Sequence, residues 1–432
     1  MKRRAPKILM LGWEFPPVIN GGLGIACHDL SIAMSEFAKI TMIIPKSNPD
    51  FIIENIDLIG LNNIDVNSLK SISSTRDYKS FDDIHYISSD LNPYYSEISS
   101  EHKHKSEEIN DTMLINEKGD TFNIDNLYGG DVIGKVTRFG KLAARLALNM
   151  DFDVIHAHDW MTMIAGMEIK ARTGKPLVMH IHSLEIDRSG VESKGWVYQI
   201  EKRGMEYADL LIPVSNFTGD NIHQYYGISR SKIAPVHNGV SKVVPFKSKR
   251  KFKEKTVLFI GRLTRQKGPE FFLDIASKIL EKDPDVRFIM AGSGDNFKGL
   301  LEQSSYRHIG NRFHLTGFLN LEQVRYLLSV TDVYCMPSVS EPFGLSAVEA
   351  AQFGIPCVIS KQSGVAEVLK GSLKFDFWDI NRAATYILNL LNDPVLQKKV
   401  VDDANENLQY IRWDISARKV MEAYQTHNIF LN

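Results

Sequence analysis

The sequence predicts an α/β protein built from two doubly wound parallel sheets. Three observations support this fold class. Short apolar runs alternate with segments of helical periodicity, which is typical of parallel sheets covered by helices. The alternation occurs twice, before and after a basic, proline-containing stretch at residues 240–255. Gly, His, Arg and Glu residues follow several strands, and ligands bind such sheets at the carboxyl ends of strands.

The first predicted domain covers residues 1–245 and begins with a strand at 8–11, a glycine-rich loop and a helix at 25–37. A strand at 40–44 follows. Residues 46–126 are polar with weak periodicity, and we expect an irregular insertion there, on the side that receives an acceptor. Regular alternation then resumes, with helices at 135–149, 161–172 and 194–207 and strands at 154–156, 177–181 and 210–214.

The second predicted domain covers residues 246–410, with a helix at 411–432 that packs back onto the first domain. Its predicted strands and helices alternate at 257–260, 271–280, 287–290, 313–315, 321–330, 333–336, 346–353 and 357–359. We expect the two domains to face each other across a cleft that holds the ligands.

Composition excludes several classes of function. The net charge of −1 gives no broad basic field for nucleic acid. No run approaches the ~20 apolar residues of a membrane span, although a peripheral membrane contact stays possible. Three widely spaced cysteines indicate a reducing compartment rather than a disulfide framework, so we expect a cytoplasmic protein.

Two features of the first domain carry candidate ligand-binding residues. Gly21 and Gly22 open a helix, where backbone N–H groups and the helix dipole favour a phosphate. A tight turn is the alternative. His156 and His158 end a strand, and we expect strand alternation to point them to opposite faces, which disfavours a shared metal. We therefore take His158, nearer the strand end, as the residue that reaches the ligand; a structural histidine is the alternative.

In the second domain, Arg262 and Lys267 follow a strand and precede a helix. Two fixed cations there suit a diphosphate, including the charge that develops as it leaves. Glu341 and Glu349 follow another strand, and would share a helix face if the helix began before Glu341. Carboxylates accept hydrogen bonds from sugar hydroxyls.

Several motifs are missing from the sequence. It has no DxD-type pair after a strand, no GxGxxG loop, no phosphate-binding P-loop and no GxSxG elbow. We therefore expect no metal and no cofactor.

Together these residues resemble the family 4 and family 5 retaining glycosyltransferases, the group that contains bacterial glycogen synthases. The segments that carry the resemblance are "GWEFPPVINGGLG", "HAHDW", "HSLEIDRSG", "FIGRLTRQKG" and "EPFGLSAVEA". It covers most of the chain outside 46–126. The resemblance implies the glycosyltransferase B fold, with two facing Rossmann-like domains, and transfer of a sugar, most simply glucose, from a nucleotide sugar to a carbohydrate acceptor such as an α-glucan.

The resemblance also implies roles for single residues. Arg262 and Lys267 bind the diphosphate, Glu341 contacts the donor sugar and Glu349 the ribose. In the first domain the loop at Gly21 and Gly22 closes over the phosphates.

By the same resemblance, His158 lies near the anomeric carbon. Phe343, Gly344 and Leu345 offer backbone N–H groups to the donor, and Asp131 matches an acidic position near the acceptor in some relatives. Open alternatives are a transferase for a surface or lipid-linked glycan with another donor, a nucleotide-sugar epimerase on the same fold, and a non-catalytic sugar-binding protein.

Overall fold

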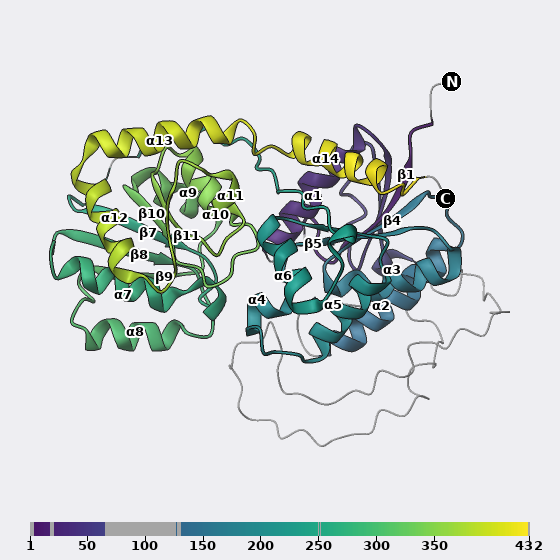
Figure 1. Cartoon of the computed structure of the whole chain (residues 1–432), viewed down its shortest axis with the longest axis horizontal. Coiled ribbons are helices and arrows are strands. Elements are labelled where there is room, and N and C mark those ends of the chain that lie inside the picture. Colours follow the sequence, from purple (N-terminus) through teal and green to yellow (C-terminus); the bar gives the residue numbers. More distant parts are fainter. Residues whose placement is uncertain are drawn as a thin grey trace, which may run out of the picture. The chain divides into compact units, whose positions relative to one another are not determined.

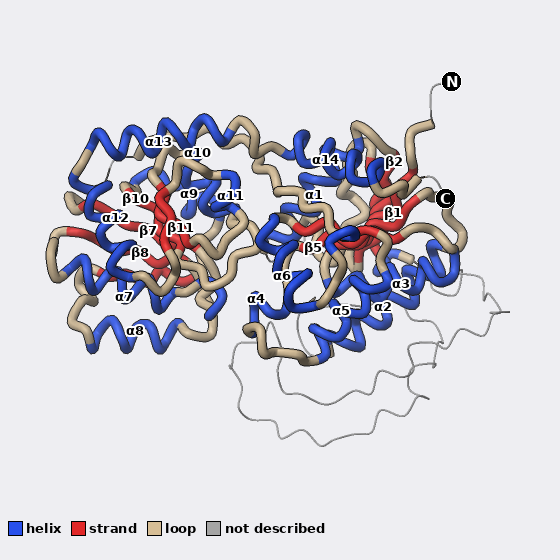
Figure 2. The backbone as a smooth tube through the Cα atoms, in the orientation of Figure 1, coloured by secondary structure: helices blue, strands red, loops and turns tan. Residues whose placement is uncertain are grey.

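The computed structural model describes residues 4–17, 21–64, 127, 131–248, 250 and 252–430. Contacts divide them into two units. The first unit holds the described parts of Met1–Ile181, Lys194–Leu211 and Met421–Asn432, and the second those of His182–Ser193 and Ile212–Val420. In each unit the strands lie in the centre and helices cover both sides (Figure 2).

The first sheet has six strands in the order β3-β2-β1-β4-β5-β6. These are β1 (Lys7–Leu11), β2 (Lys39–Ile44), β3 (Ile56–Gly60), β4 (Val154–His158), β5 (Leu177–Ile181) and β6 (Leu210–Pro213). The pairs from β3 to β5 are parallel. β4 and β5 are buried along their whole length, which explains why their residues do not alternate between apolar and charged, although His156, His158 and His180 are among them.

The second sheet repeats the same topology, with the order β12-β11-β10-β7-β8-β9. Its strands are β7 (Lys255–Ile260), β8 (Val286–Ala291), β9 (Phe313–Gly317), β10 (Val333–Met336), β11 (Cys357–Ser360) and β12 (Leu373–Phe375). Counted from the first strand of each sheet, both have the doubly wound order 3-2-1-4-5-6. The predicted fold class, two Rossmann-like α/β domains, is confirmed.

This strand order indicates which loops to examine for a ligand site. The direction of winding reverses between β1 and β4 in the first sheet, and between β7 and β10 in the second. Loops that leave the carboxyl ends of these neighbouring strands diverge and leave a crevice. The important loops are therefore those that follow β1, β4, β7 and β10.

The helices of the first unit are α1 (Gly22–Ser35), α2 (Val132–Ala147), α3 (Trp160–Thr173), α5 (Trp196–Tyr207) and the end of α14 (Trp413–Thr426). α3 packs against both α2 and α5 (Figure 1). α2 is strongly amphipathic, and its buried residues Val136, Phe139 and Ala143 recur at helical spacing.

The helices of the second unit form two layers. α7 (Pro269–Leu280), α8 (Phe297–Tyr306) and α12 (Ile380–Asn392) contribute to one hydrophobic cluster, which includes Val257 and Phe259 of β7. α9 (Leu321–Val330), α10 (Leu345–Gln352) and α11 (Val365–Val368) contribute to another, which includes Leu258. Alternate residues of β7 thus face opposite layers. The unit also contains α4 (Glu185–Ser189), α6 (Asn216–Tyr226) and α13 (Pro394–Leu408).

One correction concerns the start of the region that we took for an irregular insertion at 46–126. Ile56–Gly60 forms β3, which pairs with β2 in parallel and completes the sheet. It is followed by the short 3-10 helix η1 (Leu61–Asn63). Residues 65–126, the rest of this predicted insertion, lie outside the described part of the chain.

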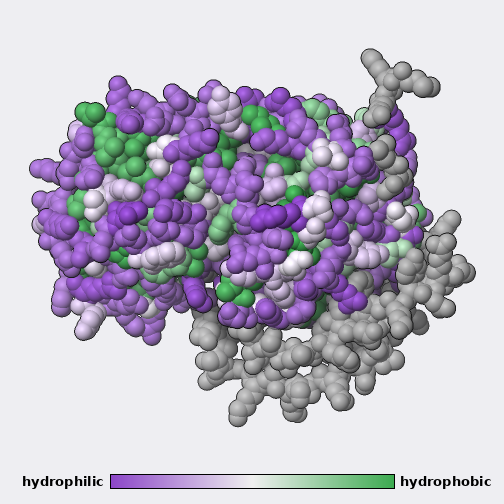
Figure 3. Space-filling model, in the orientation of Figure 1, coloured by the Kyte–Doolittle hydropathy of each residue, from purple (hydrophilic) through white to green (hydrophobic). Residues whose placement is uncertain are grey.

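Among the described residues, no helix combines the length and the apolar character needed to cross a bilayer. The face of the molecule shown in Figure 3 is mostly hydrophilic.

Candidate active site

The second unit brings Lys267 and Glu341 together at the reversal point of its sheet. Lys267 ends the 3-10 helix η6 (Arg265–Lys267) after β7, and Glu341 lies in the loop after β10. The Nζ of Lys267 lies 2.5 Å from Oε2 of Glu341. Arg262 is exposed in the same loop as Lys267. A cation, a carboxylate and a second cation thus lie on two neighbouring strand ends.

Glycine is required at the two turns that bring these residues together. Gly268 has a φ of +66°, and a Cβ there would lie 2.2 Å from the carbonyl oxygen of Pro337. Gly344 has a φ of +108°, and a Cβ there would lie 2.9 Å from Cγ1 of Val365. A side chain at Gly268 would strain the backbone and push the two loops apart, and one at Gly344 would strain the backbone and clash with Val365.

Our expectation that Glu341 and Glu349 share a helix face is wrong, because Gly344 separates Glu341 from the helix. α10 begins at Leu345, after the left-handed Gly344, so Glu341 stands outside the helix. Instead, Glu341 forms an isolated bridge to Ser363. Phe343 is buried, and Leu345 opens α10, where the first N–H groups have no partner within the helix. The loop can therefore offer backbone donors to an anionic or hydroxylated ligand.

Glu349 lies on α10 and is half-buried. Burial raises its pKa, while the nearby charge of Arg325 acts in the opposite direction. A half-buried carboxyl of this kind binds best to a partner that donates hydrogen bonds, such as a diol.

Sequence reasoning missed Asp187, a fully buried carboxyl on α4. Its Oδ1 accepts a hydrogen bond from Ser340 Oγ at 2.5 Å, and its Oδ2 accepts one from the Leu184 N–H at 2.8 Å. Burial raises the pKa of Asp187, and the charge of Glu341 raises it further. Asp187 therefore fixes the residue that precedes Glu341. The signal was present in "HSLEIDRSG", to which we gave no role.

In the first unit, three buried histidines share one face of the sheet. The rings of His156 and His158 on β4 stack with centroids 4.7 Å apart, and both stack on His180 of β5 at 5.3 Å. Our expectation that His156 and His158 point to opposite faces is wrong. Side chains alternate with a period of two, so residues i and i+2 point the same way.

His158 stays neutral at any physiological pH. It is 1% exposed, and burial lowers its pKa to about 3. A neutral imidazole donates through one nitrogen and accepts through the other. His158 is therefore suited to hydrogen-bonding a sugar hydroxyl, and poorly suited to acting as an acid.

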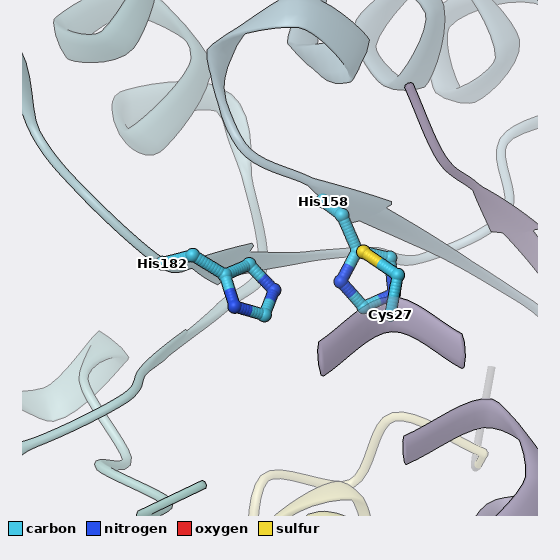
Figure 4. Close-up of side chains that lie close together, drawn as sticks. All are labelled: Cys27, His158 and His182. Carbon is cyan, nitrogen blue, oxygen red and sulfur yellow. The ribbon is translucent and has the colours of Figure 1, made fainter. Parts of the chain in front are cut away.

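The glycine loop and His158 belong to the same part of the first unit. Gly21 precedes α1 and Gly22 is its first residue, and both are exposed. In the second turn of α1, Sγ of Cys27 lies within 4.8 Å of a ring nitrogen of His158. Figure 4 shows Cys27 on α1 and His158 on β4, together with His182, the first residue after β5.

The fold itself does not require glycine at position 21. Gly21 has an extended φ of −173°, which any residue adopts, and a Cβ there would meet no heavy atom within 4 Å. An exposed helix start without side chains allows a phosphate to approach the backbone closely.

Asp131 is placed as the N-cap of α2, where its side chain accepts a hydrogen bond from the Gly134 N–H at 2.8 Å. It is exposed. Capping accounts for an aspartate at this position without a substrate. Asp131 therefore has a structural role as the cap of α2. Among the described hydrogen bonds, none joins it to another predicted site residue.

A cavity of about 560 Å³ lies in the second unit, between the end of β9 and the start of α9. Its lining mixes polar and apolar side chains: Thr316, Leu319, Asn320, Glu322, Gln323, Tyr326 and Leu327. The aromatic ring, the methylene groups and the amides suit a flat heterocycle.

Comparisons with known proteins agree with this geometry. Residues 241–407 match the family described as glycosyl transferases group 1, and residues 103–242 match glycosyltransferase family 4. An uncharacterised glycosyltransferase of Methanocaldococcus jannaschii is 30% identical over 63% of this chain and 75% of its own length. The glycogen synthase of Mycobacterium tuberculosis is 25% identical over 97% of this chain and 94% of its own.

Among solved structures, the catalytic domain of starch synthase IV from Arabidopsis thaliana, bound to ADP and acarbose, has a TM-score of 0.69. Its sequence identity is 15%, and the match covers 98% of this chain and 99% of that one, so it shows a shared fold. With the two doubly wound sheets, the matched family models and the 30% identical relative, the chain belongs to the glycosyltransferases and has the glycosyltransferase B fold, and it is similar to glycogen synthase.

Proposed function

We propose that this enzyme transfers glucose from a nucleoside diphosphate glucose to a hydroxyl of an α-glucan, with retention of configuration and without a metal. The observation that carries the proposal is the Lys267–Glu341 pair, 2.5 Å long, at the reversal point between β7 and β10. A cation for the diphosphate and a carboxylate for the sugar lie side by side, as a nucleotide sugar requires.

The chemistry follows from the charges of the second unit. Lys267 and Arg262 bind the diphosphate and stabilise the negative charge that it gains as the glycosidic bond breaks. Glu341 accepts hydrogen bonds from the hydroxyls of the glucose, and Glu349 from those of the ribose. Phe343, Gly344 and Leu345 supply backbone donors at the start of α10.

The first unit contributes groups that act on the transferred sugar. His158 hydrogen-bonds the sugar as a neutral imidazole, and Gly21 and Gly22 let the backbone approach the phosphates. The departing diphosphate takes the proton of the acceptor hydroxyl, and the new bond forms on the face that the diphosphate leaves. Catalysis consists of positioning and charge stabilisation, without a covalent nucleophile on the enzyme.

The base of the nucleotide occupies the cavity beside α9, near Thr316 and Tyr326. Both a purine and a uracil fit this description. We place the reaction in the cytoplasm, because Cys27, Cys335 and Cys357 are all buried free thiols.

A thermal-shift panel tests this proposal. The purified protein is heated in EDTA with ADP, UDP, GDP and their glucose conjugates. A ligand at ~100 times its dissociation constant stabilises the fold by ~2.7 kcal/mol, so the correct nucleotide gives a clear rise in Tm. A rise with one base supports a metal-independent donor site and names the nucleotide. A rise that appears only after Mg²⁺ is added contradicts metal independence, and no rise under either condition contradicts the donor site.

A further inference from the structure

The buried face of the first sheet contains more histidine than the proposed reaction uses. His156, His158 and His180 are all at most 1% exposed, and only His158 has a role in the proposed function. A fourth polar side chain, Tyr424, reaches this cluster from α14 and is fully buried. Buried polar groups cost free energy unless they are paired, so four of them together call for an explanation.

Hydrogen bonds join three of these residues into a chain. The hydroxyl of Tyr424 is hydrogen-bonded to Nδ1 of His156, and Nε2 of His156 lies 3.2 Å from Nδ1 of His180. Burial raises the pKa of Tyr424, so the phenol keeps its proton. Because both ring nitrogens of His156 have partners, its rotamer cannot change without breaking these bonds, and its tautomer cannot change unless Tyr424 and His180 exchange their donor and acceptor roles.

The same geometry disfavours a metal centre among the three histidines. Their ring planes are inclined to one another by only 19° to 29°. Nearly parallel, stacked rings direct their in-plane lone pairs along similar directions, whereas a metal needs lone pairs that converge on one point. A metal would also have to displace the partners of His156.

His158 packs on both other rings, 4.7 Å from His156 and 5.3 Å from His180. If Tyr424 loses its hydroxyl, Nδ1 of His156 is left buried without this partner, which costs free energy. Rotation of the ring or a change of tautomer can reduce that cost. A rotation of His156 removes the surface against which His158 rests. Displacement of a reacting group by ~1 Å lowers turnover by up to ~100-fold.

We propose that Tyr424, acting through His156, is a positioning residue that holds His158 in its reactive orientation. This inference rests on the proposed function, because it requires His158 to act on the sugar. It gives the last helix of the chain a part in turnover, although none of its residues is placed at the substrate.

The first test compares two tyrosine variants. Tyr424→Phe keeps the ring and removes the hydroxyl. Tyr226→Phe is the matched control, because Tyr226 on α6 is also fully buried, at 1% exposure. We expect Tyr424→Phe to lower kcat by about 10- to 100-fold with KM for the nucleotide sugar within about twofold. Tyr226→Phe should keep the wild-type kcat, even if its Tm falls equally. Equal losses of kcat in both variants, or none in Tyr424→Phe, would overturn the proposal.

The second test needs no activity and therefore separates this inference from the proposed function. Ring ¹⁵N chemical shifts distinguish the two neutral tautomers of histidine. We expect His156 to show one tautomer in the wild type, and a different or mixed population in folded Tyr424→Phe. An unchanged tautomer in that variant would contradict the positioning role of Tyr424, whether or not the protein transfers glucose.

A pair of variants at His180 separates loss of the hydrogen bond from loss of the fold. His180→Asn keeps a polar group close to the position of Nδ1, so it preserves a partner for His156, whereas His180→Leu does not. We expect His180→Asn to retain more of the wild-type kcat than His180→Leu. Equal activity of the two folded variants, or a stoichiometric metal found in the purified wild-type protein, would contradict the hydrogen-bonded chain.

Discussion

Replacing Lys267 by Ala tests whether the cation serves catalysis or only the fold. The side chain of Lys267 is 22% exposed and that of Glu341 is 7% exposed, with their charged atoms 2.5 Å apart. Removing the amine leaves the Glu341 carboxylate buried without its counter-charge. Breaking a fully buried pair costs ~3–5 kcal/mol, and the partial exposure of Lys267 reduces this to about 1–3 kcal/mol. For a unit of this size, Tm should fall by about 3–10 °C.

The effect on turnover should be separate and larger. Loss of one group that stabilises developing charge lowers kcat by about 10²- to 10³-fold. The double variant Lys267→Ala/Glu341→Gln removes the uncompensated charge, so it should recover much of the lost Tm and none of the lost kcat. Lys282→Ala, at an exposed position after α7, is the control and should behave as the wild type.

The assay follows release of the nucleoside diphosphate at saturating donor, below the Tm of the weakest variant, with unfolding measured on the same samples. A folded Lys267→Ala protein with near-normal kcat would refute the assignment of Lys267 to the leaving group. Recovery of kcat together with Tm in the double variant would show that the lysine serves stability alone.

Three further predictions concern other parts of the site. Gly21→Ala should leave Tm unchanged, because φ is extended and the added Cβ meets no other atom. The same variant should lower kcat/KM for the donor about tenfold or more, and unchanged kinetics would show that no ligand approaches Gly21. Glu349→Gln should raise KM for the donor about tenfold with kcat nearly constant, and the wild-type KM should rise in acid as the raised pKa of Glu349 is crossed. For His158 the folded pKa of about 3 lies below the unfolded value of 6.5, so its contribution to stability is complete above pH 6.5 and falls by ~1.4 kcal/mol per pH unit below it. The acid slope of the unfolding free energy should be shallower in His158→Gln, and an equal slope would contradict the buried neutral histidine.

Local pattern predicted the bounds of two buried strands and of one amphipathic helix, α9, which covers the predicted residues 321–330. Residues 177–181 and 333–336 form β5 and β10 with the predicted bounds, because fully buried parallel strands need no alternation. β3 was not predicted, because its sequence, IDLIG, is short and includes Asp57, and because polar residues flank it in the sequence. Its place in the sheet depends on pairing with β2, which a local pattern does not reveal.

The residues of the candidate site also differ in whether local sequence or long-range contacts reveal them. Arg262, Lys267 and Glu341 could be proposed from the sequence because each follows a predicted strand, and the structure then places Lys267 beside Glu341. Asp187 and Tyr424 were not found as site residues, because their roles come from contacts across 153 and 268 positions of the chain. The relation between His156 and His158 was available from the strand period alone, and was misjudged.

The central claim is that glucose moves from a nucleotide sugar with retention and without a metal. The most direct measurement is ¹H NMR of the product formed from ADP-glucose or UDP-glucose and a maltooligosaccharide in EDTA. The coupling of the new anomeric proton reports the configuration, which does not equilibrate once the glycosidic bond has formed. The account predicts a new α-linked glucose and release of one nucleoside diphosphate per transfer. A β-linked product, or transfer that appears only when Mg²⁺ or Mn²⁺ replaces EDTA, would contradict it.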